Sequence, residues 1–327
     1  MKREGGVALL MVLLCLALVA FLMTQFTEQG HRDLQRLARL QAETQARFHA
    51  QGAELLAERM LTDPAGRHSA QWWRWLAGEP RRLPTDEGVV MLRLEDGRTC
   101  FNLNVLAQED TGLAERQLHR LLTLENAPES PERLVARLAD WIDADSRPRP
   151  GSLDGVDYAR SVPPRTSADM PLADISEINW VEPLDPSRAL RHPSLCALPE
   201  RGPWRLNLNT LAADQLPLLD ALFEGRQSRD SLAQLIAARP AAGFTGLDDL
   251  QDRLGGQAEW VRELGDRLTL SPDYVRLHIE IEVSGHRFHF TRLLQAEGVS
   301  NWTPSVSAAR VRVLARGSLP LFQELSP

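Results

Sequence analysis

The feature that most limits how this chain can fold is an unbroken apolar run near its N-terminus, from Val7 to Met23. Lys2 and Arg3 precede the run, and the uncharged stretch Thr24–Thr27 follows it. A helix of this length is about enough to cross a bilayer core of roughly 30 Å. Because basic flanking residues tend to stay in the cytoplasm, the first residues are predicted to be cytoplasmic and the rest of the chain to lie beyond the membrane.

The alternative for this run is a secretory signal peptide, which needs small residues at a cleavage site just after the apolar segment. The stretch FLMTQFTEQG contains no clear site of that kind. Small and apolar residues instead continue at helical spacing among Gln, Glu and Arg, at Leu34, Ala38, Ala42, Ala46, Ala50, Ala53, Ala57 and Met60. This pattern predicts one long helix, half lipid-facing and half soluble.

Gly6 followed by Val7-Ala8-Leu9-Leu10 resembles the short basic leader and prepilin-peptidase site of type IV pilin-like proteins. The implied cut lies between Gly6 and Val7. Most pilins and pseudopilins carry Glu as the fifth mature residue, where this chain has Met11. The K pseudopilins of type II secretion systems, the GspK family, also lack that Glu, so the departure narrows the resemblance to them. A carboxylate inside the bilayer is costly, and a subunit without one suits the end of a filament better than its middle.

Two segments after the helix differ in pattern. Pro, Gly and Trp are frequent between Thr62 and Gly88, which predicts an irregular packed connection. The following stretch, GVVMLRLEDGRTCFNLN, alternates apolar and polar residues around Asp96-Gly97. Such a pair between alternating runs favours a hairpin, with strands near 89–95 and 98–104.

From Val105 to about Leu270 the pattern becomes helical, in segments such as AERQLHRLLTL, PERLVARLADWIDA and SLAQLIAARP that Pro and Gly separate. Strand character returns in YVRLHIEIEVSGHRFHFTRLLQA, where Ser284-Gly285 lies between alternating runs, and again in ARVRVLARG. The sheet is therefore predicted to be interrupted by the helical block and completed after it.

The predicted fold is α+β: a pilin-like long N-terminal helix and a small antiparallel sheet, with a large all-helical domain of the SAM or helix-hairpin-helix kind inserted between strands. The K-pseudopilin resemblance implies the same architecture. The expected boundaries are a leader at 1–6, the N-terminal helix at 7–61 with its membrane part at about 7–26, an α/β domain from 62–104 and 271–327, and the insert at 105–270.

The segment from Asp140 to Glu177 holds the densest acidic cluster in the chain, interleaved with Gly and Pro. Its acids are Asp140, Asp143, Asp145, Asp154, Asp157, Asp169, Asp174 and Glu177. Hard oxygen ligands on a backbone rich in turns suit Ca²⁺, although the spacing is not that of an EF-hand. The structural alternative is that these acids cap helices and form turns in contact with solvent.

The same segment is similar to the K-pseudopilin signature in Trp141–Asp145, Gly151–Tyr158 and Pro163–Leu172. Leu153 stands where the family usually has Glu, Asp169 where Asn is common, and Leu172 where Met is common. Calcium is therefore an expected cofactor, and the candidate ligands are Asp143, Asp145, Asp154, Asp157 and Asp169.

A second motif, WRLNLNTLAADQLPLLDALFEG, is echoed earlier by CFNLNVLAQED and resembles helix-hairpin-helix modules. In other proteins such modules bind the DNA backbone, so a membrane-anchored DNA-binding protein is the alternative function. That function needs backbone amides and basic side chains facing phosphates. The surrounding helices instead carry Asp214, Asp220, Glu224, Asp248, Asp249 and Asp252. The formal net charge of −7 likewise gives a nucleic-acid partner no support. A structural helical subdomain is therefore the favoured interpretation, and no nucleic-acid partner is expected.

No catalytic motif is present: the sequence lacks HExxH, GxSxG, a P-loop, a Rossmann fingerprint and a zinc-site spacing, so no enzymatic activity and no catalytic residue are expected. Of three cysteines, Cys15 lies inside the predicted membrane span. Cys100 and Cys196 remain for an oxidising compartment, where they form either one disulfide or two buried free thiols.

The resemblance, which covers nearly the whole chain, implies a minor pseudopilin that forms or caps the tip of a periplasmic pseudopilus and supports protein export across the outer membrane. It implies a single-pass inner-membrane protein with its C-terminal domain in the periplasm. The implied partners are other minor pseudopilins of the I and J types and then the H type, the major pseudopilin, the prepilin peptidase and the inner-membrane secretion platform.

Overall fold

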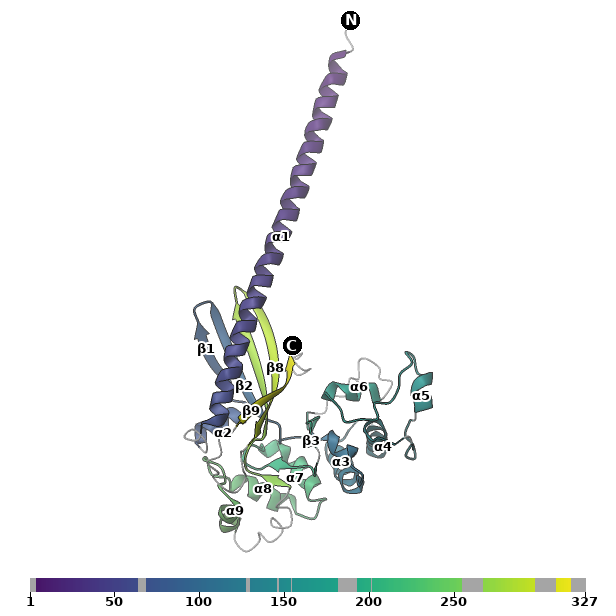
Figure 1. Cartoon of the computed structure of the whole chain (residues 1–327), viewed down its shortest axis with the longest axis vertical. Helices are drawn as coiled ribbons and strands as arrows, with labels where there is room; N and C mark the ends of the chain where they lie inside the picture. The colour runs from purple at the N-terminus through teal and green to yellow at the C-terminus, as the bar shows by residue number, and fades with distance from the viewer. Residues whose placement is uncertain are drawn as a thin grey trace.

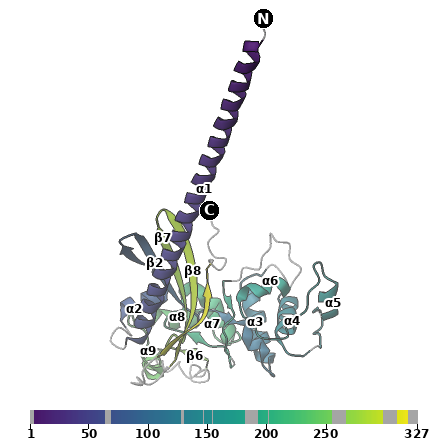
Figure 2. The same cartoon turned by 45° about the horizontal axis from the view of Figure 1, so that its top comes forward.

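The computed structural model describes residues 4–63, 69–127, 130–145, 147–153, 155–181, 193–200, 202–254, 267–297 and 310–318. One helix, α1 (Glu4–Thr62), projects far beyond the rest of the molecule (Figure 1). Its C-terminal part lies on a sheet, and a domain of short helices sits at the end of the molecule farthest from the N-terminus (Figure 2). The long helix and the mixed α+β fold are as the sequence predicts.

Within the described residues the main sheet is antiparallel and runs in the order β1-β2-β7-β8-β9. Its strands are β1 (Arg81–Thr85), β2 (Gly88–Asp96), β7 (Tyr274–Val283), β8 (His286–Glu297) and β9 (Arg310–Gly317). β2 and β7 are neighbours although residues 97–273 separate them in the sequence. The helical domain is therefore inserted between two adjacent strands, and both chain crossings lie at one end of the sheet.

The turn between β7 and β8 confirms the prediction made from Ser284-Gly285. Both residues have positive φ, 50° for Ser284 and 74° for Gly285. Two central residues of this kind match the twist of the flanking strands, and glycine adopts the conformation without steric cost. The strand predicted in ARVRVLARG is also confirmed, as β9.

The predicted hairpin at Asp96-Gly97 is wrong. β2 ends there, and its partners are β1 and β7. The chain then turns into the insert, where β3 (Phe101–Asn102) pairs in parallel with β4 (Leu195–Cys196), and η1 (Leu103–Ala107) follows. The physical reason is that Arg98, just after the turn, is buried and bound to carboxylates from distant segments, so the local hairpin pattern is overridden.

The connection before β2 is more regular than predicted. It contains α2 (Ala70–Leu76) as well as β1. Ser69 caps α2 by accepting a hydrogen bond from the Trp72 backbone N–H at 3.1 Å. Trp72 and Trp73 are buried at the end of α1, so two of the three tryptophans here serve the core.

The insert consists of two units built on one plan. The first unit contains β3, η1, α3 (Gly112–Leu124), α4 (Pro131–Ile142), α5 (Gly155–Arg160), η2 (Ile175–Glu177), α6 (Ile178–Val181) and β4. The second contains β5 (Leu206–Asn207), η4 (Ala213–Gln215), α7 (Leu216–Leu222), α8 (Arg229–Ala237), α9 (Leu247–Leu254) and β6 (Leu268–Thr269). In each unit a two-residue parallel ladder joins the first strand to the last. The helices predicted in AERQLHRLLTL, PERLVARLADWIDA and SLAQLIAARP are confirmed as α3, α4 and α8.

A buried asparagine closes each unit in the same way. The Asn104 side chain donates to two backbone carbonyls at 3.0 Å and accepts from a backbone N–H at 2.7 Å. The Asn209 side chain donates to two carbonyls at 2.9 and 3.0 Å and accepts from an N–H at 2.7 Å. The backbone partners are Leu172 and Leu198 in the first unit, and Phe244 and Leu270 in the second. The echo between the two NLN segments of the sequence therefore marks a repeated structural unit.

Candidate functional site

The N-terminal part of α1 has the properties of a membrane anchor. From Leu9 onward it is long and apolar enough to cross a bilayer, and its apolar window is not buried against the described protein. Gly6 and Val7, the predicted cleavage site, lie within α1, and their side chains are outside the described set. Cys15 is exposed on the same apolar stretch.

The alanine face of α1 packs on the chain's own sheet. Ala42, Ala46, Ala50, Ala53 and Ala57 are all buried against β2, β7 and β8. Small side chains at helical spacing let the helix approach the sheet closely. From Ala42 to Ala57 this face of α1 is therefore already occupied within the chain.

The opposite face of α1 is apolar and uncovered. Large exposed side chains continue past the membrane segment at Leu34, Leu37, Leu40, Phe48 and Leu55. At 3.6 residues per turn Leu37, Phe48 and Leu55 fall about half a turn away from the alanine face, and Leu34 and Leu40 flank them at about a third of a turn. Phe48 remains 68% exposed and Leu55 66%. A soluble helix that is apolar on two sides is typical of an element with a partner on each side. We call these five residues the outer stripe.

One carboxylate clamps α1 to the far strands of the sheet. Glu54 accepts from Arg292 Nε on β8 at 2.8 Å and from Arg316 Nη2 on β9 at 2.6 Å. The hydrogen bond from Arg316 lowers the pKa of Glu54, while burial opposes this shift. These two contacts of Glu54 fix the rotation of α1 about its own axis on the sheet. They therefore also fix the direction in which the outer stripe faces.

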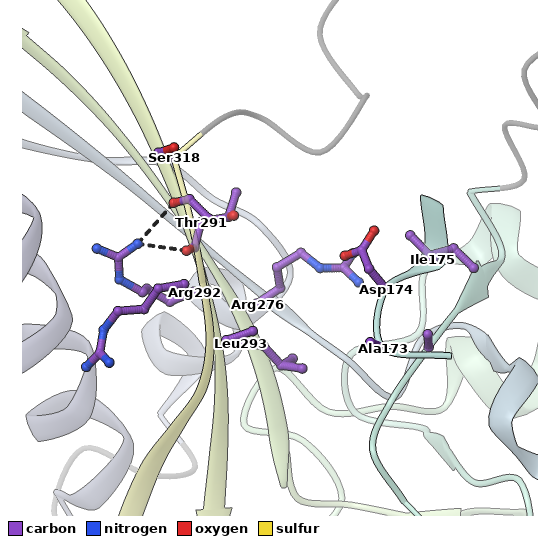
Figure 3. A pocket seen from close by; sticks show the side chains of 12 residues that line it. Ala173, Asp174, Ile175, Arg276, Thr291, Arg292, Leu293 and Ser318 are labelled. Atoms are coloured by element: carbon purple, nitrogen blue, oxygen red, sulfur yellow. Dashed lines mark hydrogen bonds between the residues drawn. The ribbon is translucent and has the colours of Figure 1, made fainter. Parts of the chain in front are cut away.

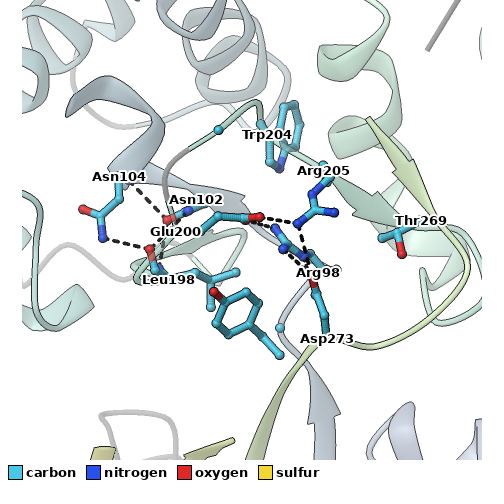
Figure 4. Close-up of polar contacts among 12 residues, drawn as sticks. Arg98, Asn102, Asn104, Leu198, Glu200, Trp204, Arg205, Thr269 and Asp273 are labelled. Atoms are coloured by element: carbon cyan, nitrogen blue, oxygen red, sulfur yellow. Dashed lines mark hydrogen bonds and ion pairs between the residues drawn. The ribbon is translucent and has the colours of Figure 1, made fainter. Parts of the chain in front are cut away.

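A buried ion cluster joins the sheet to the insert at the two chain crossings. The Arg98 guanidinium binds Asp273 with two hydrogen bonds, of 2.7 Å from Nε and 2.6 Å from Nη2 (Figure 4). Glu200 binds both Arg98 and Arg205, and Arg205 reaches Asp273 at 3.1 Å. Arg98 is only 1% exposed. Burial alone would lower its pKa, but the two carboxylates outweigh burial and raise the pKa of Arg98 above its usual value.

Asp96, at the end of β2, lies beside this cluster and accepts only from uncharged groups. Its carboxylate accepts from the Arg98 backbone N–H at 2.8 Å, from Thr210 Oγ1 at 2.7 Å and from Asn207 Nδ2. Burial is the main cause that raises the pKa of Asp96 to about 6, and the nearby charge of Asp273 adds to the rise.

The structure divides the predicted calcium ligands. Asp145 and Asp169 line one cavity of about 110 Å³, together with Asp140. Asp143 instead faces Arg149, whose Nη1 lies 2.6 Å from its carboxylate. Asp157 is on α5 and does not line this cavity, and Asp154 lies outside the described residues.

The donor set fits a calcium ion only in part. Arg149 also binds Asp140 and Glu115, so a guanidinium neutralises much of the acidic cluster. Burial raises the pKa of Asp143, and the hydrogen bond from Arg149 opposes that rise. Across the described ranges no three His, Cys, Asp or Glu side chains gather in a metal-binding arrangement. Asp145 and Asp169 are the two predicted ligands that face shared open space.

Cys100 and Cys196 form a disulfide, with their Cα atoms 5.9 Å apart. The bond joins the start of β3 to the end of β4 and so closes the first unit of the insert. Of the two states that the sequence allows for these cysteines, a disulfide or two free thiols, the structure has the disulfide.

Two arginines beside the turn of the helix-hairpin-helix segment are paired with acids. The turn between α7 and α8 contains Glu224 and Gly225, both with positive φ. Arg116 binds Glu224 at 2.9 Å, and Arg120 binds Asp220. These arginines hold the two units of the insert together, so they are not disposed toward a phosphate backbone.

The residues that join the parts of the molecule were not predicted from the sequence: Arg98, Asp273, Glu200, Arg205 and Glu54. For Glu54 the sequence offered one signal, a carboxylate beside a helix face of alanines. For the ion cluster around Arg98 it offered none, because the members come from three segments whose proximity depends on the tertiary fold.

Comparisons with known proteins agree on one family. A sequence profile described as "Type II secretion system (T2SS), protein K" matches residues 99–200, and a second profile of that description matches residues 206–271. These ranges span the two units of the insert. The chain is 34% identical over 258 residues to the type II secretion system protein K of Klebsiella pneumoniae, covering 75% of this chain and 78% of the relative.

Two further similarities cover more of the chain. The protein K of Pectobacterium carotovorum subsp. carotovorum is 31% identical over 315 residues, covering 91% of this chain and 94% of the relative. Among solved structures, a chain of the GspK-GspI-GspJ complex from the enterotoxigenic Escherichia coli type 2 secretion system matches with a TM-score of 0.67 and 27% identity. That match covers 86% of this chain and 99% of the solved chain.

Proposed function

This chain belongs to the type II secretion system protein K family, and from that premise we propose that it forms or caps the tip of the periplasmic pseudopilus and so supports protein export across the outer membrane. Its role in this proposal is structural and not enzymatic. The solved relative comes from a complex with GspI and GspJ, so the proposed neighbours are pseudopilins of the I and J types, followed by the H type and the major pseudopilin.

The observation that carries this proposal is the outer stripe of α1. The chain's own sheet covers one face of the helix, and Leu37, Phe48 and Leu55 remain exposed on the other. Helices of neighbouring subunits can cover such a stripe and remove its apolar surface from water. The position of the insert supports the tip role, because this bulk sits at the end of the molecule away from the membrane helix (Figure 1).

The decisive experiment measures assembly through the outer stripe. The full chain in detergent is mixed with tagged pseudopilins of the I and J types, and co-purification is measured. Phe48→Glu is expected to lower the recovered complex by about tenfold or more, because it places a charge in an apolar interface. Gln35→Glu is the matched control: Gln35 is exposed and lies two turns before Ala42, on the opposite side of the helix. Equal recovery of both variants would contradict the proposal.

We also propose processing by prepilin peptidase between Gly6 and Val7, with the mature chain anchored in the inner membrane and its C-terminal domain in the periplasm. The basic residues before the apolar run support this orientation. Intact mass measured with and without the peptidase is expected to differ by residues 1–6. An unchanged mass would remove the basis for filament assembly but would leave the fold unaffected.

Calcium is a separate proposal for the acidic segment, with Asp145 and Asp169 as its first ligands. Support comes from their shared cavity, and hard carboxylate oxygens suit Ca²⁺. Calcium at about a hundred times its Kd is expected to stabilise the full chain by roughly 2.7 kcal/mol, measured as a rise in unfolding temperature. Asp169→Asn is expected to reduce that rise, whereas Asp230→Asn, at an exposed position of α8, is expected to leave it unchanged. No response of the wild-type chain to calcium would exclude this site.

A further inference from the structure

Gly52 lies in the soluble half of α1, well before the helix ends at Thr62. Its backbone is helical, so no turn requires a glycine here. Among the described residues, no atom outside the backbone of this helix and the two chain neighbours lies within 4 Å of the position that a Cβ would take. Glycine inside a helix is destabilising relative to alanine. No contact of the described chain therefore accounts for the missing side chain.

Gly52 is one corner of an open hole on the surface of α1. Four exposed residues are neighbours on one face of the helix because they are three or four positions apart: Phe48, Gln51, Gly52 and Leu55. When two helices pack, four residues at this spacing form the hole that receives one side chain of the facing helix. Because the corner at Gly52 is empty, a facing helix can come closer here than at the large side chains of the outer stripe. We call these four residues the Gly52 hole.

The contacts of Glu54 fix where this hole faces. Arg292 Nη1 donates to the backbone carbonyls of Thr291 at 2.8 Å and Gly317 at 3.2 Å, which holds the guanidinium on the sheet (Figure 3). The same guanidinium donates from Nε to Glu54 at 2.8 Å. Glu54 directly precedes Leu55 in the chain, so this contact keeps the Gly52 hole directed away from the sheet.

The apolar surface around the hole continues toward the membrane. Met23 and Phe26 are exposed at the end of the apolar run, and at 3.6 residues per turn they lie on the same side of α1 as Phe48. A partner that follows this surface along α1 leaves the bilayer beside it, so a partner with its own membrane span fits. A single span in a bilayer is an α-helix. The apolar side chains of Phe48 and Leu55 favour a large apolar side chain in the hole.

We propose that the Gly52 hole receives a large apolar side chain, a leucine, methionine or phenylalanine, from the N-terminal helix of a neighbouring pseudopilin. Gly52 is then the point of closest approach between the two helices, and the absence of a side chain there serves the partner and not the fold of the chain itself. This contact rests on the proposed function, because it specifies how the outer stripe meets its partner.

Two substitutions of Gly52 test the contact through effects of opposite sign. Gly52→Ala and Gly52→Leu are each expected to raise the unfolding temperature of the full chain in detergent by about 1 to 4 °C, because the new side chain meets open space and favours the helix. In co-purification with tagged pseudopilins of the I and J types, Gly52→Ala is expected to lower the recovered complex about fivefold and Gly52→Leu more than about tenfold, because each fills the hole.

A matched control and a crosslink locate the contact. Gln35→Leu introduces the same side chain at an exposed position on the other side of α1, and its recovery is expected to stay within about twofold of wild type. The photo-crosslinker benzoylphenylalanine, placed at Gln51 on the rim of the hole, is expected to link to the partner. Mass spectrometry is expected to place that link in the N-terminal helix of the partner, beyond its membrane segment.

Phe48→Glu separates this contact from the proposed function. If Phe48→Glu lowers recovery and Gly52→Leu does not, the outer stripe serves assembly but the hole receives no side chain. If neither lowers recovery, or if wild type is not recovered with its partners, the proposed function fails as well. Equal losses for Gln35→Leu and Gly52→Leu, or a crosslink in the globular domain of the partner, would also overturn the contact. If Gly52→Leu lowers the unfolding temperature, Gly52→Ala decides, since it adds only one methyl group.

Discussion

Asp96 is a buried carboxylate whose hydrogen-bond donors are all uncharged, so its ionisation opposes folding. Its pKa rises from 3.8 to about 6, which means that the folded state binds the proton more tightly than the unfolded state does. The stability that comes from this proton is complete below about pH 4 and is lost as the pH rises through about 6.

The pH dependence of unfolding tests this carboxylate. The free energy of unfolding of wild type minus that of Asp96→Asn is expected to grow by on the order of 2 to 3 kcal/mol as the pH falls from about 7 to about 4. Denaturant unfolding of the full chain in detergent measures the difference at each pH. Asp230→Asn is the control for removal of a surface charge. If the difference in unfolding free energy does not change with pH, the folded state does not raise the pKa of Asp96.

At the residue scale, the sequence was informative where chemistry follows from residue type alone. Two cysteines outside the membrane span allowed either one disulfide or two free thiols, and the structure contains the disulfide. The acids after Trp141 predicted a cation site, but Arg149 occupies the space between Asp140 and Asp143. No local pattern indicates that this arginine folds back onto carboxylates before it in the chain.

At the scale of single elements, Glu54 decides how α1 lies on the sheet. Glu54→Gln is expected to cost about 1 to 3 kcal/mol of stability, because the buried guanidinium of Arg292 loses its counter-charge. Glu43→Gln, which breaks an exposed pair with Arg47 on the same helix, is expected to cost less than about 0.5 kcal/mol. Thermal unfolding of both variants measures the contrast. Equal costs would mean that the clamp does not hold the helix.

The repeated units of the insert predict a second effect at this scale. Asn104→Leu and Asn209→Leu are each expected to cost roughly 2 to 4 kcal/mol. The first leaves the carbonyl and the N–H of Leu172 without their asparagine partner, and the second does so for the carbonyls of Phe244 and Leu270 and the N–H of Phe244. Amide exchange is expected to rise mainly in the unit that carries the substitution. Exchange that rises equally in both units would show that they unfold as one.

Elements were predictable where one periodicity extended over many residues. The helix α1 and the hairpin of β7 and β8 were predicted because each pattern agrees with the partners that the fold provides. The hairpin at Asp96-Gly97 failed because a turn signal competed with a buried ion cluster, and the tertiary contacts of Arg98 prevailed. The outer stripe was not predicted, because the alanine periodicity accounts for one packed face of α1 and gives no indication of a second apolar face.

At the scale of the whole molecule, the ion cluster around Arg98 joins the sheet to the insert. Arg98→Met is expected to cost about 3 to 5 kcal/mol, because Asp273 and Glu200 lose the buried one of the two arginines that pair with them and keep Arg205. Arg98→Lys is expected to fall between Arg98→Met and wild type, since lysine keeps the charge but lacks the two-pronged geometry. In calorimetry, the single unfolding transition of wild type is expected to become two transitions in Arg98→Met, one for the sheet and one for the insert. A single transition at the wild-type temperature would show that the ion cluster does not couple them.

The position of the insert between β2 and β7 also sets an order of events in time. When the chain emerges from its N-terminus, α1 and β2 appear first, but the strand that completes their core follows only after residues 97–273. During that interval β7 and β8 are not yet present to cover the alanine face, so both the alanine face and the outer stripe of α1 are exposed to water. Distant pairing of this kind is slow. If assembly uses the outer stripe as proposed, a newly made chain passes through a stage in which either apolar face of α1 can contact a neighbour, and the pairing of β7 leaves only the outer stripe exposed.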